Sequence, residues 1–356
     1  MYLFRAGFRT TIYRCAEAMT VFAVMTAGLF PVLHLGRPWK FFWLIPYPNW
    51  RYIWPQFKSP LVWDVFAILT YLTVSSTFLY IGLIPDIAVL RDRENISPIR
   101  KRIFSVLSLG WRNTDREWRH FARAYLFLAA FSTPLVLSVH SVVSFDFAMA
   151  LTPGWHTTIF PPYFVAGAIY SGFAMVLTIA IPLRKAYALE DFITMRHLEN
   201  MAMVMLATGL IVAYGYFFEY FMSIYSANKF DLYLTHMRFH GPYSHFYYAL
   251  ILCNILTPQL LWFHKARTSI PLLFVMSLVV NLGMWLERFV IVVISLTRDF
   301  MPSAWGRYSA TVWDYATFAG TIGLFVMLLF LFVRVMPAIS IAEMRELVAE
   351  TSEDHE

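Results

Sequence analysis

The chain has 356 residues, of which 59% are hydrophobic, 18% are aromatic and only 14% are charged. Soluble domains carry charges on about a quarter of their residues, so this composition excludes an ordinary soluble enzyme and predicts an integral membrane protein. The net charge of +6 does not indicate a nucleic-acid partner, because the Lys and Arg residues lie between apolar stretches and form no basic domain.

Apolar stretches long enough to cross a bilayer as helices, roughly 20 residues each, recur along the whole sequence. They predict an all-α, polytopic transmembrane helix bundle with eight spans. The expected spans are approximately 12–34, 61–84, 121–147, 160–184, 200–226, 244–264, 268–297 and 311–336.

The chain is expected to form one transmembrane domain over residues 1–341, followed by a polar and acidic tail over 342–356. No linker rich in Gly, Ser or Pro divides it. Lys and Arg gather in the stretch from RDRENISPIRKRIF to WRHFAR, and the positive-inside rule places this stretch in the cytoplasm. Both termini are then cytoplasmic, and the loops at 35–60, 148–159, 227–243 and 298–310 lie outside.

Metal and haem sites are not expected in this chain. Its two cysteines form no CxxC or CxxCH motif, which excludes covalent haem and a cysteine-ligated iron–sulfur cluster. None of the spans clearly contains the two histidines that a haem-binding bundle commonly uses. The spacing of His236, His240 and His245 suits a metal cluster, but this stretch is expected to be a loop without supporting carboxylates, and FHGPYS to be a turn.

Four titratable residues are expected near the outer ends of three spans. His34 ends the first span, Asp64 begins the second, and His140 and Asp146 lie near the end of the third. Ionisable groups at membrane depth are costly, which makes each of them a candidate functional residue. Six helical positions turn Asp146 about 120° away from His140, so both face one cavity only if the helix ends or distorts near Ser144.

A histidine and carboxylates beside aromatic residues suit the oxidation of a quinol. Its hydroxyls need groups that accept protons near neutral pH, and its ring needs flat apolar walls. Trp39, Trp43, Trp63 and Phe145 are available for those walls. The alternative is an aromatic belt with interfacial polar residues. Arg37 either helps to position the quinol or interacts with headgroups or a partner subunit.

Two adjacent charges, Glu287 and Arg288, are predicted well inside the seventh span. Because neighbouring residues point about 100° apart on a helix, each is expected to need a partner on another span. Glu219 and Asp314 are the candidate partners. A structural ion-pair network and a proton route through these four residues remain equally good interpretations.

The motifs AEAMTVFAVMTAGLFPVLHLGRPWKFFWLIPYPN, SPLVWDVFAILTY, SVHSVVSFDFA, FHGPYS and ERFVIVV resemble one family over essentially the whole chain. It is the family of polysulfide-reductase and NrfD membrane subunits, and the likeness is greatest to the quinol-binding membrane subunit of alternative complex III. The resemblance implies ten helices, so the first and most of the second are expected to be missing from this sequence.

The resemblance also implies a function. His34, Asp64 and Asp146 match positions that this family uses in quinol oxidation at the periplasmic face of the bacterial inner membrane. Electrons are expected to pass to an iron–sulfur partner subunit and on to haem c subunits, beside a paralogous membrane subunit. The substrate is expected to be menaquinol or another quinol. The alternatives are the paralogous proton-conducting subunit, a structural membrane anchor, and a transporter, although no matching broken spans indicate the last.

Overall fold

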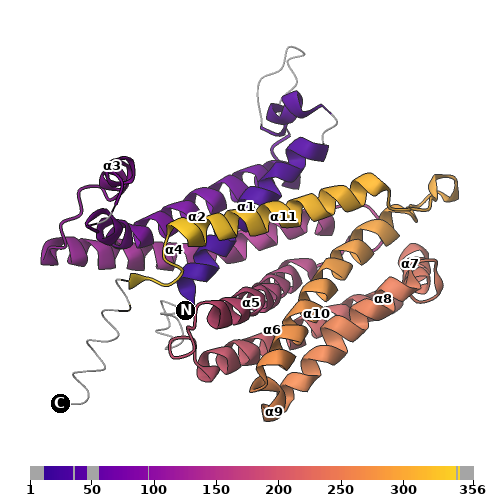
Figure 1. Cartoon of the computed structure of the whole chain (residues 1–356). Helices are drawn as coiled ribbons and strands as arrows, with labels where there is room; N and C mark the ends of the chain where they lie inside the picture. The colour runs from indigo at the N-terminus through magenta and orange to yellow at the C-terminus, as the bar shows by residue number, and fades with distance from the viewer. Residues whose placement is uncertain (1–11, 35–36, 46–55, 95, 342–343, 345–356) are drawn as a thin grey trace. The chain divides into compact units, whose positions relative to one another are not determined.

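The computed structural model describes residues 12–34, 37–45, 56–94, 96–341 and 344, and every regular element in these ranges is a helix (Figure 1). The prediction of an all-α, multi-pass bundle is therefore confirmed. Within the described residues, seven helical segments are long and apolar enough to cross a membrane. They are α1 (Tyr13–His34), α2 (Pro60–Arg91), α4 (Asp115–Ala148), α5 (Phe160–Ala186), α6 (Met195–Ser226), α10 (Ile270–Phe289) continued by η4 (Val290–Ile294), and α11 (Val312–Val335).

The eighth expected span, 244–264, is helical but changes its geometry twice. It consists of α8 (Ser244–Ile251), the π-helical η2 (Leu252–Leu256) and the 3-10 helix η3 (Thr257–Trp262). In η2 the Thr257 N–H group donates to the Leu252 carbonyl, five residues back instead of four. Such wide turns widen a helix locally and are frequent at functional sites. The same geometry recurs in η4.

The remaining elements are short. They are η1 (Pro38–Leu44), α3 (Pro98–Leu107), α7 (Lys229–His240), α9 (His264–Arg267) and η5 (Pro302–Ala304). The expected outer loop over 227–243 is mostly the helix α7. The Asn228 side chain caps it by accepting a hydrogen bond from the Phe230 N–H group at 3.0 Å. Of the FHGPYS stretch, which was expected to be a turn, residues 241–243 form the turn, while Phe239 and His240 end α7 and Ser244 begins α8.

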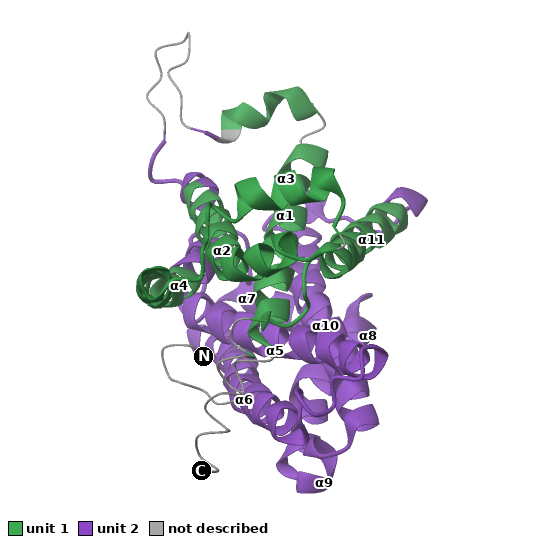
Figure 2. Cartoon of the chain, turned by 60° about the vertical axis from the view of Figure 1, so that its left-hand side comes forward, with its two compact units in different colours: residues 1–43, 66–136, 314–356 green, residues 44–65, 137–313 purple. Residues whose placement is uncertain are grey.

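The described chain divides into two compact units (Figure 2). The first comprises residues 1–43, 66–136 and 314–356, and the second comprises residues 44–65 and 137–313. Both α2 and α4 contribute one part to each unit. The expected single transmembrane domain over 1–341 stays a prediction, and nearly all of the expected tail over 342–356 lies outside the described residues.

A buried ion pair joins two helices of the first unit. The Arg14 Nη2 atom of α1 lies 2.9 Å from Oδ2 of Asp86 in α2, and both side chains are 0% exposed. Arg14 also donates to the Gly82 carbonyl at 2.8 Å. One turn along α1, Glu17 accepts a hydrogen bond from the Tyr125 hydroxyl of α4 at 2.6 Å. These contacts give Arg14, Asp86 and Glu17 each a polar partner, which lowers the free-energy cost of burying them in an apolar environment.

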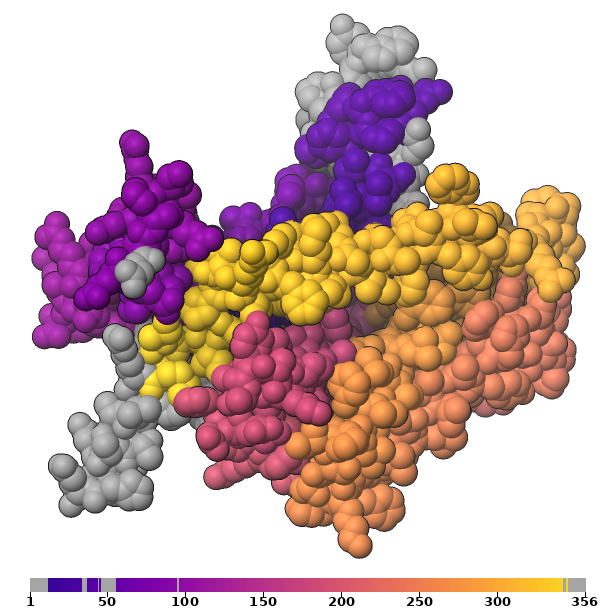
Figure 3. All heavy atoms as spheres, in the orientation of Figure 1, coloured from indigo at the N-terminus to yellow at the C-terminus, as the bar shows by residue number. Residues whose placement is uncertain are grey.

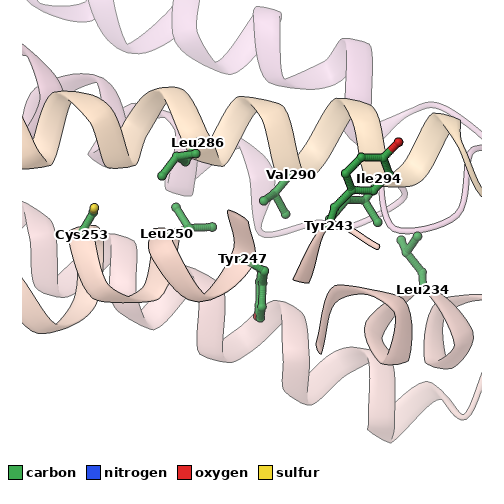
Figure 4. Packing of buried hydrophobic residues seen from close by; sticks show 8 residues of the cluster. All are labelled: Leu234, Tyr243, Tyr247, Leu250, Cys253, Leu286, Val290 and Ile294. Carbon is green, nitrogen blue, oxygen red and sulfur yellow. The ribbon is translucent and has the colours of Figure 1, made fainter. Parts of the chain in front are cut away.

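The second unit packs α5, α6, α8 and α10 around an apolar core. Leu286, Val290 and Ile294 line one side of α10 and η4 and face Leu250 and Cys253 (Figure 4). The surface of these helices is continuous in the space-filling view (Figure 3). Close packing depends on small residues, because a Cβ atom at Gly215 of α6 would lie 2.6 Å from the Tyr163 ring of α5.

Candidate functional site

Two carboxyl groups meet at one end of the second unit. Asp64 lies in the first turns of α2 and Asp146 in the last turn of α4, and their side chains lie close enough to form a hydrogen bond with each other. Two carboxyl groups can make this bond only when one of them carries a proton. The Oδ1 atom of each is buried and has no hydrogen-bond partner among the described residues. The pair therefore has acceptor capacity left for a further donor.

Aromatic side chains border this pair. The Trp63 ring meets the Phe145 ring edge to face, with centroids 6.3 Å apart and planes at 86°. The Trp63 indole N–H group donates to the Phe57 carbonyl at 2.7 Å, which fixes its orientation. The residues that precede the two aspartates in sequence thus form an apolar contact of their own, of the kind that a flat ring can pack against.

His140 and Asp146 point to different neighbours. Helix α4 continues as α-helix past Ser144 to Ala148, so no distortion brings the two side chains onto one face. Asp146 lies beside Asp64, whereas His140 lies within range of an electrostatic interaction with the Arg288 guanidinium of α10. Asp146 thus belongs to the carboxyl pair, and His140 adjoins a second polar cluster.

This second cluster centres on Glu287, which is 1% exposed. Its Oε2 atom accepts a hydrogen bond from the Tyr216 hydroxyl of α6 at 2.6 Å, and Asn254 of η2 donates to the same hydroxyl at 2.8 Å. The Arg288 Nη2 atom lies 3.3 Å from Oε1 of Glu287, and the Arg288 guanidinium stacks 3.8 Å from the Phe164 ring centroid. Glu287 is thus held directly by Tyr216 of α6 and Arg288 of its own helix, and Asn254 supports the Tyr216 hydroxyl.

The π-helical turns lie at this cluster. Asn254 belongs to η2, and η4 begins three residues after Glu287. At Gly283 of α10, a Cβ atom would collide with the Asn254 side-chain oxygen, so a glycine is required for the two segments to approach. The local helix geometry therefore serves to bring the Asn254 amide within reach of Tyr216.

Glu219 does not pair with Glu287 or Arg288, as the sequence suggested, but with Arg238 of α7. Their Oε1 and Nη2 atoms are 2.7 Å apart, and the side chains are 14% and 8% exposed. Burial acts to lower the pKa of Arg238, but the Glu219 carboxylate outweighs it and raises the pKa, so the guanidinium keeps its charge. Asp314, the other suggested partner, lies in the first unit, in the exposed first turn of α11.

Three other predicted site residues also belong to the first unit. His34 is the last residue of α1, but its side chain lies outside the described atoms. Arg37 and Trp39 are exposed, with Trp39 69% exposed at the start of η1. The structure brings together Asp64 with Asp146, and Glu287 with Arg288, while the predicted roles of His34, Arg37 and Trp39 stay predictions.

The sequence analysis missed Arg238, Tyr216 and Asn254. Arg238 was assigned to a loop, although Phe230, Leu234 and Met237 recur at helical spacing after the capping Asn228 and could have indicated the helix. Asn254 interrupts the apolar run ILCNILT, and a lone polar amide at membrane depth itself indicates a candidate functional residue. Tyr216 carries no such signal, because tyrosines are common throughout this chain.

Metal ligation finds no support in the described ranges. No group of three or more His, Cys, Asp or Glu side chains there is arranged to hold an ion. His236 and His240 stack on each other in α7, with ring centroids 4.7 Å apart. This is the contact expected of residues one helical turn apart.

Fold and site together define a multi-pass helical membrane subunit with carboxylates and aromatic residues gathered at membrane depth. Residues 4–298 match the family model of NrfD, the polysulphide reductase family, and the chain belongs to that family. Members are typically quinone-interacting membrane subunits linked to an iron–sulfur subunit in oxidoreductase complexes.

One relative is a Halobacterium salinarum protein named as a membrane subunit of a dimethyl sulfoxide reductase. It is 25% identical over 170 residues, which cover 47% of this chain and 34% of the relative. The chain thus spans about a third of the length of the curated relative that it matches. The resemblance to the wider family is confirmed.

Proposed function

We propose that this chain is the quinol-oxidising membrane subunit of an electron-transfer complex, with the role of ActC in alternative complex III. The Asp64–Asp146 pair carries the proposal. Oxidation of a quinol to a quinone releases two protons and two electrons. The Oδ1 atoms of the pair have no hydrogen-bond partner among the described residues, so they can accept hydrogen bonds from the quinol hydroxyls.

In this mechanism the ionised member of the pair takes a proton from one quinol hydroxyl while the Trp63–Phe145 contact positions the ring. His34 is the proposed acceptor for the other hydroxyl, and Arg37 and Trp39 are the other residues proposed to bind the quinol. His140 is not assigned to this pocket, because it adjoins the Glu287 cluster. The two electrons leave one at a time to an iron–sulfur cluster of a partner subunit, because this chain is proposed to bind no redox centre itself.

The assembly follows from that role. Menaquinol is the proposed substrate, haem c subunits are the proposed later electron acceptors, and a paralogous membrane subunit and lipids are the proposed neighbours. The proposed location is the bacterial inner membrane, with the carboxyl pair at the periplasmic face.

The cluster around Glu287 favours a second candidate function, proton conduction of the kind proposed for the paralogue ActF. Glu219, Glu287 and Arg288 are the proposed participants in the second unit, and Asp314 in the first. A structural network alone would account for the ion pairs, but it does not require a carboxylate as deeply buried as Glu287.

The test of the proposed function is quinol-driven acceptor reduction by the purified complex carrying Asp64→Asn. The amide keeps the shape of the carboxylate but not its basicity, so reduction should slow by roughly a hundredfold, as general-base effects do. The polypeptide content and the cofactor spectra are measured on the same sample. An unchanged rate in an intact complex would exclude Asp64 from the chemistry and leave a structural anchor as the better account.

A further inference from the structure

A polar chamber of about 310 Å³ opens at the end of the second unit where α6 ends and α7 begins. His156, Thr158, Ser226 and Asn228 border it and are exposed. Glu219 and Arg238 line it as well and are nearly buried. An exposed border and a buried, charged end describe a pocket that opens to the aqueous phase and extends inward.

The walls of the chamber suit water. Ser223 of α6 and Thr235 of α7 place their hydroxyl oxygens 2.7 Å apart, and Asp231 accepts a hydrogen bond from the Gly154 N–H group at 3.0 Å. The buried Nε atom of Arg238 has no hydrogen-bond partner among the described residues. A buried donor in a polar, roomy site is a site for ordered water.

A second, much smaller cavity of about 10 Å³ lies behind the ion pair. Glu219 and Arg238 line both cavities, and Glu287, Tyr163 and Tyr216 line only the smaller one. Its volume is at the lower limit of what can hold one water molecule, roughly 10–15 Å³. The Glu219–Arg238 pair therefore lies between the open chamber and a small space beside the buried Glu287 carboxylate.

We propose that the chamber is a proton port, through which Glu287 exchanges protons with the outer aqueous phase by way of Glu219. Glu219 is the relay carboxylate, and Arg238 is the positioning residue that holds it between the two cavities. The inference rests on the proposed function for the source of the protons, which turnover of the quinol supplies. It assigns them an exit that is separate from the Asp64–Asp146 pair.

The first part of the test concerns water access and needs no turnover. Thr235→Cys places a thiol in the chamber, and Phe217→Cys places one on an exposed apolar position of the same unit. In right-side-out membrane vesicles, a membrane-impermeant maleimide should label Thr235→Cys at least about tenfold faster than Phe217→Cys. The parent with its native Cys15 and Cys253 gives the background. Equal labelling of the two variants would overturn the port.

The second part follows protons and electrons together. A soluble naphthoquinol, at less than one equivalent per complex, is mixed with vesicles that contain an excess of one-electron acceptor, so that each complex turns over once. A pH dye reports protons released outside, and absorbance reports acceptor reduction. In this single turnover, Glu219→Gln should delay proton release at least about tenfold behind electron transfer, and Glu219→Asp should restore most of the rate. Asp231→Asn is the matched control, since Asp231 lines the chamber but not the small cavity.

The two proposals fail in different ways. If proton release in Glu219→Gln keeps pace with electron transfer, the port is wrong and the quinol site is untouched. If the wild-type complex oxidises no quinol, the proposed function is wrong, and the labelling result alone decides whether the chamber opens to outer water.

Discussion

The carboxyl groups of Asp64 and Asp146 lie close enough to form a hydrogen bond although they come from two different helices, α2 and α4. A hydrogen bond between them requires one shared proton, so a bonded pair carries at most one negative charge. A pair of this kind can take up a proton from a substrate and pass it on without two full charges being buried together. This relationship explains why two aspartates are tolerated at membrane depth.

The first prediction concerns the aromatic contact beside the pair. Trp63→Leu should raise the KM for quinol about two- to tenfold and change kcat less, because the indole positions the ring but takes no proton. Steady-state kinetics of the purified complex measure both constants. Trp262→Leu, at a 58% exposed position, is the control and should change neither. A large fall in kcat alone would contradict a positioning role.

The second prediction concerns Tyr216, which donates to the buried Glu287 carboxylate. Tyr216→Phe should destabilise the protein by about 1.5–3 kcal/mol, the usual value of a hydrogen bond to a charged group. Thermal denaturation in detergent provides the measurement. Tyr220→Phe, on the exposed side of the same helix, should leave the midpoint nearly unchanged. Equal midpoints for both variants would show that Glu287 does not depend on this hydroxyl.

A third prediction separates close packing from helix propensity at two glycines. Gly215→Ala should destabilise the second unit by about 1–3 kcal/mol, because the new methyl group would meet the Tyr163 ring at 2.6 Å. Gly172→Ala in α5 has open space around its Cβ position and should stabilise slightly, by about 0.4–1 kcal/mol. The two thermal midpoints should therefore move in opposite directions, and a shift in the same direction would contradict the packing of α5 on α6.

The fourth prediction concerns ion pairs of the first unit. Asp86→Asn removes the partner of the fully buried Arg14 and should cost about 3–5 kcal/mol. Asp92→Asn breaks a pair with Arg91 whose carboxylate is 63% exposed, and it should have almost no effect. Protein yield and thermal inactivation of the two variants test the contrast. If Asp86→Asn lost as little stability as Asp92→Asn, Arg14 would have found another partner in the variant.

Hydrophobic periodicity predicted the helix bundle well, because every span must satisfy its own backbone in lipid. It predicted the change of geometry at Asn254 poorly, since a π-turn depends on packing against Gly283 and not on local propensity. The sequence placed Asp64 and Asp146 near one depth, but it did not predict that their carboxyl groups meet. The pairing of Glu219 with Arg238 was not predicted either, because residues 227–243 were expected to form a loop.

The most direct test of the central claim is a double-mutant cycle on Asp64 and Asp146. Quinol-driven acceptor reduction is measured for Asp64→Asn, Asp146→Asn and the double variant, with the polypeptide content of each complex checked. If the two carboxyls act as one proton acceptor, each single variant should lose roughly a hundredfold, and the double variant should lose little more. Independent losses that multiply, or a single variant at the wild-type rate, would contradict a shared role in quinol oxidation.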